Sequence, residues 1–321
     1  PDFDTPAHIR RAAAEAIESG QTRYTPTAGT PALRQAISEK LARENQLAYA
    51  PREIIATCGA KHAIFNALAI TVQTGDEVLV PAPYWVSYPD MVLACDGTPV
   101  VVPCVEEDGF KLTPAVLDAA ITARTKWLII NSPSNPTGAA YTLEELQALA
   151  EVLRRHPQVL VMTDDIYEHI RFDGQPTPHL LNAAPDLRER TLLINGVSKT
   201  YAMTGWRIGY AAGPSDLIGA LDILQSQSTS NPSSVSQAAA LAALTGDQGF
   251  VAEFADTYRR RRDRGLELIN AIDGLSCRKP EGAFYLFINC SGLLGRQTPE
   301  GKVIESDIDV VMYFLESTGV A

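Results

Sequence analysis

A lysine and an arginine that follow one short apolar run are the first residues with the means to do chemistry. The run is Leu192–Ile194, and Lys199 and Arg207 come soon after it. A lysine in an apolar setting at the end of a strand has a lowered amine pKa and can form a Schiff base. An arginine among aromatic residues and glycines suits a bidentate contact with an anion. The alternative for Lys199 is an ordinary surface lysine.

Two other apolar runs also lead into residues that could bind a ligand. Gly59, Ala60 and Lys61 open a helical pattern, where free backbone N–H groups could bind an anion such as phosphate. Asn135 lies in a loop with two prolines and a glycine, which could hold its amide at a fixed angle. For both segments the alternative is an ordinary turn made of typical turn residues.

Asp164 and Tyr167 follow a further apolar run, Val159–Met162. A carboxylate at a buried strand end is costly unless it meets a cation, although an aspartate that caps a helix is the alternative. Ligands of open α/β sheets bind beyond the carboxyl ends of the strands. Pyridoxal phosphate needs an anion site, an anion for its ring nitrogen, donors for its phenolic oxygen and an amine for its aldehyde. The joint pattern therefore predicts a pyridoxal phosphate site.

The elements that position these residues alternate along the chain. Short apolar runs without polar alternation predict strands that are buried on both faces, as parallel sheets require. These runs are Ile54–Ala56, Val78–Val80, Val100–Val102, Trp127–Ile130, Val159–Met162 and Leu192–Ile194. Helix starts are predicted where a threonine precedes a proline or begins a capping box. These starts are Thr5-Pro6, Thr30-Pro31, Thr113-Pro114 and Thr142 with Glu145.

The alternation predicts an α/β fold with a mainly parallel mixed sheet flanked by helices, and a smaller α+β domain. We place the large domain at residues 1–260, where the first residues are compatible with the small domain or a linker. Residues 261–321 are then an incomplete small domain. It is expected to contain a long helix after about Arg260, an apolar strand at Ala283–Ile288 and a helix from about Asp307. The serine-rich stretch Ser226–Ser236 is expected to be an ordered loop.

Composition limits the classes of partner. The 321 residues include 38 acidic and 27 basic side chains, so the net charge of −11 argues against nucleic acid and anionic membranes. The basic cluster Arg259–Arg264 is expected to be a solvated helix face. No apolar run is long enough to cross a bilayer. Five scattered cysteines without a CxxC pair predict a reduced, cytoplasmic protein, and neither they nor the five histidines predict a metal site.

The sequence resembles the class I aminotransferases of pyridoxal phosphate fold type I, and the likeness covers essentially the whole chain. It looks closest to the bacterial aspartate and aspartate/prephenate enzymes. The motifs that give the resemblance are Tyr24–Gly29, Pro83–Pro89, Asn135–Gly138, Asp164–Glu168, Ser198-Lys199 and Gly205–Tyr210.

The resemblance implies a role for each matched residue. Lys199 would form the internal aldimine and then shuttle the proton, while Asp164 would pair with the pyridinium nitrogen. Asn135 and Tyr167 would bind the phenolic oxygen. Residues expected at the cofactor phosphate are Gly59, Ala60, Ser198 and Arg207, joined by Tyr24 from a second subunit of a homodimer. Residues expected at the ring and the substrate are Trp85, which stacks on the ring, Asn135, and Lys61 near the distal carboxylate.

The chain departs from the family pattern in two respects. Gly196 stands where many relatives have a serine, which removes one hydroxyl from the phosphate site. The arginine that binds the substrate α-carboxylate belongs to a C-terminal stretch that these 321 residues do not include, and the usual glycine-rich segment before Pro1 is also missing. We therefore expect that residues 1–321 alone transaminate poorly, and that an upstream targeting segment is compatible with this sequence.

The resemblance implies a ping-pong aminotransferase with aspartate as donor and 2-oxoglutarate as acceptor, with prephenate as a further substrate. Glutamate and aromatic donors stay open at this point. One alternative is a β-eliminating C–S lyase of the same fold, which would release pyruvate from cysteine conjugates without an acceptor acid. Another is a non-catalytic, cofactor-sensing regulator fused to a DNA-binding domain, although no basic helix-turn-helix is visible and a DNA shift assay would test it.

Overall fold

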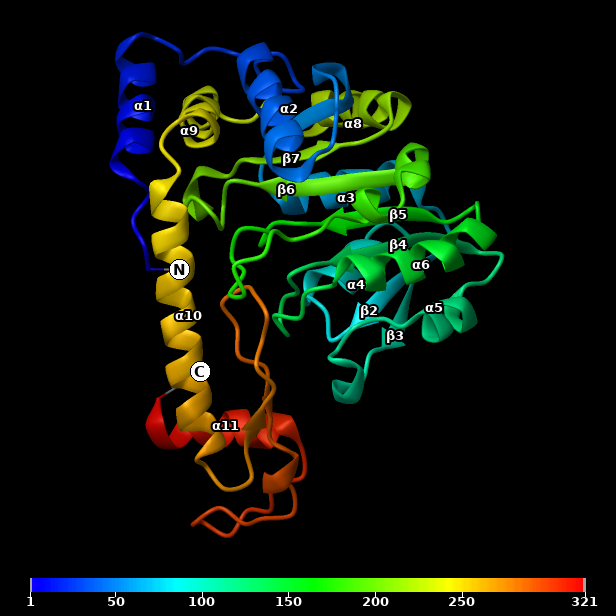
Figure 1. Cartoon of the computed structure of the whole chain (residues 1–321), viewed down its shortest axis with the longest axis vertical. Helices are drawn as coiled ribbons and strands as arrows, with labels where there is room; N and C mark the ends of the chain where they lie inside the picture. The colour runs from blue at the N-terminus through cyan, green and yellow to red at the C-terminus, as the bar shows by residue number, and fades with distance from the viewer. Residues whose placement is uncertain (1, 320–321) are drawn as a thin grey trace.

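The computed structural model describes residues 2–319 (Figure 1). The strands are β1 (Ile54–Thr57), β2 (Glu77–Ala82), β3 (Thr98–Pro103), β4 (Thr125–Asn131), β5 (Leu160–Asp164), β6 (Thr191–Gly196), β7 (Gly209–Ala212), β8 (Ser276–Cys277) and β9 (Ile288–Asn289). The helices are α1 (Ala7–Glu18), α2 (Pro31–Asn45), α3 (Ala60–Thr71), α4 (Ser87–Leu93), α5 (Pro114–Ala120), α6 (Leu143–Arg155), α7 (Leu180–Ala183), α8 (Ser215–Ser228), α9 (Ser234–Thr245), α10 (Gly249–Asn270) and α11 (Asp307–Thr318). Short 3-10 turns are η1 (Pro51–Glu53), η2 (Glu106–Asp108), η3 (Pro185–Arg190), η4 (Thr204–Trp206) and η5 (Ser291–Leu293).

A seven-stranded sheet in the order β1-β7-β6-β5-β4-β2-β3 forms the centre of the molecule. The pairs among β3, β2, β4, β5 and β6 are parallel, whereas β7 runs antiparallel to both of its neighbours, β1 and β6. All six runs predicted to be buried strands lie in this sheet, which confirms the α/β fold class. The sequence analysis missed β7, whose small residues Gly209, Ala211 and Ala212 do not form an apolar run typical of a strand.

Side chains of the sheet alternate between two apolar cores. Leu128 and Ile130 of β4 point into a core shared with α2, α6 and α9, while Trp127 and Ile129 point into a core shared with α3, α4 and α8. Both faces of the sheet are therefore covered over its central strands, which need apolar residues on both sides, as the sequence indicated. The prediction is wrong for Val100–Val102, because β3 lies at the edge of the sheet and Val101 is 47% exposed. The carboxyl ends of the parallel strands stay uncovered by these layers, and the functional site forms there.

Most predicted helix starts are confirmed by their hydrogen bonds. The hydroxyls of Thr30, Thr113 and Thr142 accept bonds from the backbone N–H three residues later, and Glu145 completes the capping box of α6. Thr5 was wrongly predicted to cap α1. Its hydroxyl instead donates to the Ala202 carbonyl (2.7 Å) and accepts from the Trp206 indole (3.0 Å), so it binds the chain start to the loop after Lys199.

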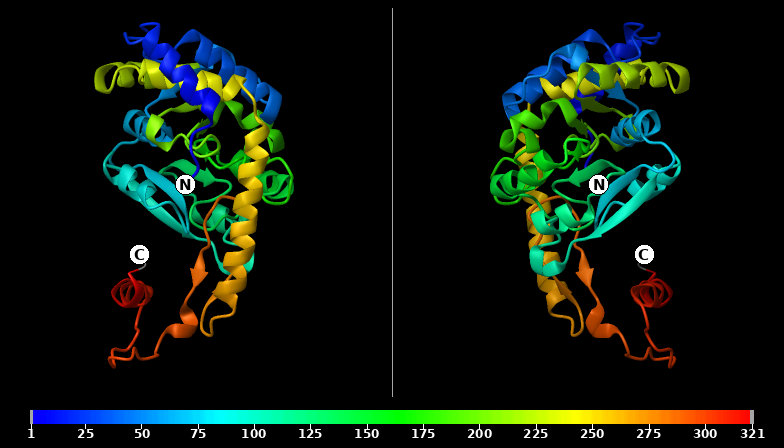
Figure 2. Two further views of the ribbon diagram at one scale, coloured as in Figure 1. Left: turned by 90° about the vertical axis from the view of Figure 1, so that its left-hand side faces the viewer. Right: turned by 90° about the vertical axis from the view of Figure 1, so that its right-hand side faces the viewer.

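The C-terminal part of the chain differs from the expectation. Figure 2 shows α10 as one long helix along the side of the molecule and α11 at the end far from α1 and α2. Since α10 begins at Gly249, the boundary proposed at residues 260/261 falls within this helix. The predicted strand at Ala283–Ile288 is wrong, because only Ile288–Asn289 pairs with β8. Ala283 has a φ of 56°, and Phe284 packs with Tyr258 in an aromatic cluster instead of on a sheet.

Two smaller expectations also change. The stretch Ser226–Ser236 is only partly a loop, because α8 continues to Ser228 and α9 begins at Ser234. In the basic cluster, Arg262 is not solvated: it is 9% exposed, donates to the Pro280 carbonyl (3.0 Å) and lies 4.6 Å from the Phe172 ring centroid. Within residues 2–319, no helix is both long and apolar enough to span a bilayer, and no cluster of side chains suits a metal ion.

Candidate active site

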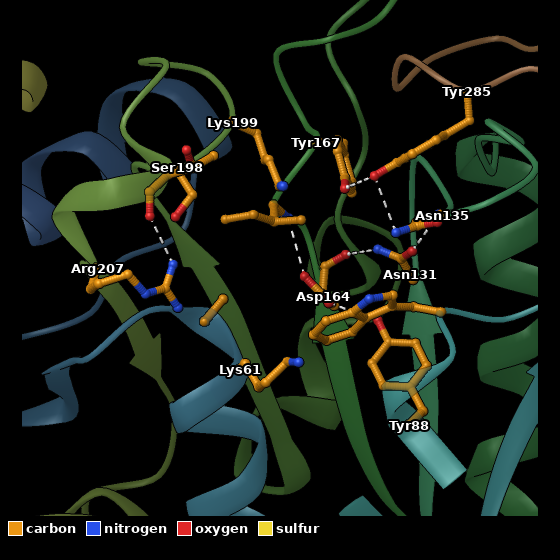
Figure 3. Close-up of a pocket in the computed structure, with 14 residues that line it drawn as sticks. Lys61, Tyr88, Asn131, Asn135, Asp164, Tyr167, Ser198, Lys199, Arg207 and Tyr285 are labelled. Carbon is orange, nitrogen blue, oxygen red and sulfur yellow. Dashed lines mark hydrogen bonds between the residues drawn. The ribbon is translucent and has the colours of Figure 1, made fainter. Parts of the chain in front are cut away.

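The predicted site residues come together around one cavity of about 300 Å³ at the carboxyl ends of the strands (Figure 3). Asn131 and Asp164 are the last residues of β4 and β5, and Ser198 and Lys199 follow β6. The residues that line the cavity are Ala60, Lys61, Trp85, Tyr88, Asn131, Asn135, Asp164, Ile166, Tyr167, Ser198, Lys199, Thr204, Arg207 and Tyr285. A single cavity thus collects side chains from the ends of β1, β2, β4, β5 and β6 and from the segment after α10.

Arg207 lies against the turn that precedes the N-terminus of α3. Gly59 precedes the helix with a φ of 89°, a conformation that favours glycine, and a Cβ there would lie 2.3 Å from Nη2 of Arg207, so a larger residue would also push the guanidinium away. The guanidinium donates to the Thr204 carbonyl (2.9 Å) and, more weakly, to the Cys58 carbonyl (3.4 Å). No carboxylate in the described part of the chain pairs with it, so its charge is available to a phosphate group at the helix N-terminus.

Asp164 is a buried carboxylate at the end of β5. It is 3% exposed, and burial raises its pKa. The Tyr88 hydroxyl donates to its Oδ2 (2.7 Å), and the Ile166 backbone N–H approaches its Oδ1 (3.4 Å). Within residues 2–319 no basic group lies at ion-pair distance from this carboxylate. A protonated ring nitrogen placed in the cavity would supply the missing positive partner.

Lys199 points into the cavity from the loop after β6 (Figure 3). Burial lowers the pKa of its amine, an effect that the nearby Arg207 adds to and Asp164 opposes. Its Nζ lies 5.7 Å from the ring centroids of both Tyr167 and Phe284. A lowered pKa increases the fraction of neutral amine at physiological pH, and the neutral amine is the form that attacks an aldehyde.

Asn135 and Tyr167 lie together on the opposite wall of the cavity. The Asn135 side chain donates to the Tyr285 hydroxyl (3.2 Å), which lies 2.7 Å from the Tyr167 hydroxyl. Asn131 positions this wall, because its Oδ1 accepts from the Asn135 backbone N–H (2.7 Å) and its Nδ2 donates to the Asp164 carbonyl (2.7 Å). The amide and the phenol are therefore held where a ligand oxygen could accept from both.

Lys61 and Trp85 form a separate pair on the cavity wall. The Lys61 ammonium lies 4.6 Å from the centroid of the Trp85 ring, a cation–π contact. Lys61 has no acidic partner at ion-pair distance among the residues that the structure describes. The pair therefore combines a flat apolar surface with an unneutralised positive charge.

A buried ion pair supports the strand ends from behind the cavity. Lys40 of α2 is 1% exposed and pairs with Glu168, which also accepts from Asn45 (2.6 Å) and Asn195 (2.6 Å). These contacts lower the pKa of Glu168 to about 2 against its burial. Since Glu168 follows Tyr167 directly and Asn195 precedes Ser198 and Lys199 in the chain, this pair links two loops of the site.

Two predicted site residues stand apart from the cavity wall. Gly59 does not line the cavity but contacts Arg207, as described above. The Tyr24 side chain is 90% exposed and does not line the cavity of its own chain. Arg207 is the only arginine of residues 2–319 among the lining residues.

The sequence analysis did not assign a role to five of the lining residues: Tyr88, Asn131, Ile166, Thr204 and Tyr285. Asn131 could have been found by its position directly after an apolar run, the rule that selected Asp164. Tyr88 lay within a recognised motif, but nothing in the sequence indicated its contact with Asp164. No local signal pointed to Tyr285, which lies 118 positions from Tyr167 in the chain.

The donor set fits pyridoxal phosphate. Arg207 and the start of α3 could bind an anion, and among residues 2–319 the buried Asp164 has no ion-pair partner, which a protonated ring nitrogen would provide. Asn135 and Tyr167 offer donors for a phenolic oxygen, and Lys199 offers an amine of lowered pKa. These four features lie around one cavity of suitable size for a small cofactor.

Comparisons with known proteins agree with this fit. Residues 1–314 match the family of class I and II aminotransferases. The chain is 54% identical to an aspartate aminotransferase of Rhizobium meliloti over its whole length, covering 78% of that protein. It is also 54% identical to the aspartate/prephenate aminotransferase of Cereibacter sphaeroides, covering 80% of that protein.

Solved structures extend the agreement to the fold. The crystal structure of the Rhizobium meliloti aspartate aminotransferase superposes with a TM-score of 0.98 at 53% identity, over 100% of this chain and 80% of that one. The aspartate aminotransferase of Thermus thermophilus with maleate gives a TM-score of 0.89 at 43% identity, over 99% and 80% of the two chains. The protein therefore belongs to the class I and II aminotransferases and is a pyridoxal-phosphate-dependent enzyme of that family.

Proposed function

We propose that the protein transfers the amino group of aspartate to 2-oxoglutarate by a ping-pong route. The observation that supports this substrate class is the unneutralised ammonium of Lys61, which lies beside Trp85 in the same cavity as Lys199. Aspartate and 2-oxoglutarate each carry a second carboxylate that a cation can bind. The names of the relatives, aspartate and aspartate/prephenate aminotransferases, support the same assignment.

Different residues of the cavity would bind different parts of the cofactor. Arg207, Ser198 and the Gly59-Ala60 turn would bind the phosphate, and Tyr24 of a second subunit would add a hydroxyl there. Trp85 would stack on the ring, and Asn135 would contact both the cofactor and the substrate. Bound pyridoxal phosphate supplies an aldehyde for the amino group and a ring that accepts the electron pair released at the α-carbon.

Three side chains would act on protons or charge at the reacting atoms. The neutral Lys199 amine would hold the cofactor at its aldehyde group in the resting enzyme. Once the substrate amine replaces it, Nζ of Lys199 would carry the proton between the substrate α-carbon and the cofactor carbon. Asp164 would keep the ring nitrogen protonated, because a buried carboxylate is stabilised by a positive partner. Tyr167 would donate to the phenolic oxygen.

A donor and acceptor panel tests the proposal. Purified enzyme saturated with pyridoxal phosphate is incubated with aspartate, glutamate, alanine or phenylalanine and with either 2-oxoglutarate or prephenate, and each new amino acid is quantified. Aspartate with 2-oxoglutarate should give the highest kcat/KM. Prephenate is a second candidate acceptor, because it too has a distal carboxylate and a relative is named for it. Pyruvate release from a cysteine conjugate without any acceptor would identify a C–S lyase instead.

The assembly and domain assignments are part of the same proposal. The 90% exposed side chain of Tyr24 is compatible with a role in a neighbouring subunit of a homodimer. Residues 1–260 would form the cofactor-binding domain and residues 261–321 a smaller domain, with α10 running continuously across this boundary. Five unpaired cysteines are compatible with a cytoplasmic location. Light scattering of the loaded enzyme, with Tyr24→Phe as the variant for cofactor affinity, tests the shared site.

A further inference from the structure

Tyr285 reaches the site from a part of the chain that contributes no other lining residue. It belongs to the segment Pro280–Tyr285, which follows α10 and β8. Figure 3 shows its side chain extending toward Asn135 and Tyr167, with its hydroxyl between them. The two residues that face a ligand oxygen thus share one partner, and that partner is Tyr285.

The backbone of this segment is bound to both loops that position the pair. The N–H groups of Glu281 and Gly282 donate to the Gly138 carbonyl (3.1 and 2.9 Å), three residues after Asn135. The Ala283 N–H donates to the Ile170 carbonyl (2.8 Å), three residues after Tyr167. The hydroxyl of Tyr285 is therefore placed by hydrogen bonds to the same loops that its partners occupy.

The donor direction along this chain of polar groups follows from its chemistry. The Asn135 amide nitrogen can only donate, so the Tyr285 oxygen accepts from it. The Tyr285 hydroxyl forms one other hydrogen bond with the described residues, to the Tyr167 oxygen 2.7 Å away. If Tyr285 donates there, the proton of Tyr167 is left to point into the cavity. An oxygen that accepts a hydrogen bond becomes a stronger donor through its own proton.

We propose that Tyr285 is a positioning residue that donates to Tyr167 and thereby strengthens the hydrogen bond from Tyr167 to the phenolic oxygen of the cofactor. This inference rests on the proposed function, because it places that oxygen between Asn135 and Tyr167. It makes the electronic state of the cofactor depend on the segment after α10. Displacement of Pro280–Tyr285 would weaken the donor without moving any residue of the strand ends.

We call the action of Tyr285 on the cofactor through Tyr167 the relay. The pH dependence of the visible absorbance of the enzyme with bound pyridoxal phosphate tests it. Loss of the proton shared by Lys199 and the cofactor leaves negative charge on the phenolic oxygen, and hydrogen-bond donors stabilise that charge. A weaker donor therefore raises the pKa at which the absorbance changes. We expect Tyr285→Phe to raise this pKa by roughly 0.5 unit, a fraction of one neutral hydrogen bond. Tyr167→Phe should raise it further, because it removes the direct donor.

The double variant separates a relay from a direct contact. If Tyr285 acts through Tyr167, then Tyr167→Phe with Tyr285→Phe has the pKa of Tyr167→Phe alone. An additional shift in the double variant would show that Tyr285 contacts the cofactor itself and would overturn the relay. An unchanged pKa in Tyr285→Phe would overturn it as well. Tyr258→Phe is the matched control, because the centroid of this ring lies 5.2 Å from that of Phe284 and no hydrogen bond within residues 2–319 involves its hydroxyl.

A second variant keeps the hydroxyl in place. A fluorinated tyrosine introduced at position 285 is a stronger donor with nearly the same shape, and it should lower the pKa instead of raising it. A shift in the same direction as Tyr285→Phe would contradict the relay. If the wild-type enzyme shows no visible absorbance with pyridoxal phosphate, the proposed function fails, whereas a titrating wild type with an unaltered Tyr285→Phe variant refutes only this inference.

Discussion

The hydroxyl of Tyr88 donates a 2.7 Å hydrogen bond to Oδ2 of Asp164, and both side chains are almost fully buried. This bond lowers the pKa of Asp164 against the effect of its burial. It therefore favours the carboxylate form, which is the form that a protonated ring nitrogen needs as a partner. The proximity of Asp164 also raises the pKa of Tyr88, so this phenol stays a donor.

Tyr88→Phe should consequently weaken binding of pyridoxal phosphate. The lost bond is charge-assisted, and a loss of about 1.5–3 kcal/mol corresponds to roughly a 10- to 100-fold higher dissociation constant. Equilibrium dialysis of the apoenzyme measures this constant. Tyr141→Phe removes another buried phenol, which accepts from the Leu112 N–H (2.8 Å) and does not line the cavity, and should leave the constant unchanged. Equal losses in both variants would contradict the role of Tyr88.

Lys199→Ala should abolish the visible absorbance of the covalently bound cofactor and nearly all turnover. The alanine has no amine to react with the aldehyde or to move the α-proton, so we expect a loss of several orders of magnitude in kcat. Cofactor binding should persist in part, because Arg207 and the start of α3 are unaltered. An unchanged spectrum in this variant would refute the assignment of Lys199.

Lys61→Ala should reduce activity with dicarboxylic donors selectively. Loss of a charge-assisted contact of about 1.5–3 kcal/mol predicts roughly a 10- to 100-fold lower kcat/KM for aspartate. Alanine and phenylalanine have no distal carboxylate and serve as internal controls. Lys61→Met keeps an apolar contact on the Trp85 ring and should behave like Lys61→Ala if the charge is what matters. A uniform loss for all donors would indicate that Lys61 serves the cofactor.

The buried pair of Lys40 and Glu168 predicts a pH-dependent stability. The pKa of Glu168 is depressed to about 2, so its contribution is fully present above about pH 4.5 and is lost as the pH falls toward 2. His179 is buried in its neutral form with a pKa lowered to about 4, so its contribution is lost between about pH 6.5 and 4. Burial raises the pKa of Asp165, so this carboxyl destabilises the folded protein at neutral pH and the destabilisation decreases as the pH falls.

Glu168→Gln isolates the first of these contributions. It removes the negative charge at position 168 and leaves Glu44, 3.5 Å away, as the carboxylate partner of the buried Lys40 ammonium. The loss of one charge-assisted contact should lower the free energy of unfolding at pH 7 by about 1.5–3 kcal/mol. Urea unfolding at a series of pH values should also show a flatter dependence below pH 4.5 than in the wild type. His179 remains in the variant, so the change between pH 6.5 and 4 should persist. A slope below pH 4.5 that matches the wild type would refute the pairing.

Gly138 offers a test of the docking of Pro280–Tyr285. Its φ is 68°, and a Cβ there would lie 2.4 Å from the Pro280 side chain and 2.6 Å from the Gly282 carbonyl oxygen. Gly174 has a similar φ of 72°, but a Cβ there would meet nothing within 4 Å. Gly138→Ala should therefore lower kcat and raise the pKa of the visible absorbance, while Gly174→Ala carries only the backbone strain of about 1 kcal/mol. Similar effects of both changes would contradict the docking.

The sequence predicted those parts of the site that lie directly after apolar runs. Asp164 and Lys199 could be predicted because the carboxyl ends of parallel strands meet at one edge of the sheet, and the strands could be recognised by their continuous apolar residues. Tyr285 could not be found in this way. It contacts Tyr167, 118 positions away in the chain, and Asn135, 150 positions away. No local sequence pattern indicates contacts between residues so far apart.

Two predictions based on local sequence patterns were wrong. Thr5-Pro6 has the residue types of a capped helix start, but the Thr5 hydroxyl is hydrogen-bonded to Ala202 and Trp206 instead of to the helix. Ala283–Ile288 is apolar enough for a strand, yet its first residues are bound to Gly138 and Ile170 and pack among aromatic rings. In both segments the partner that decides the conformation lies far away in the chain, and tertiary contacts override local propensity.

The antiparallel strand β7 also determines when the cofactor site can assemble during synthesis. β1 enters the sheet only by pairing with β7, and these strands lie about 150 residues apart in the chain, a pairing of high contact order. At about 5–20 residues per second, a ribosome needs roughly 8–30 s to deliver β7 after β1. The turn after β1 and Arg207, which precedes β7, therefore meet only late. We therefore expect that pyridoxal phosphate binds only after β7 has been synthesised and that β1 stays without its sheet partner until then.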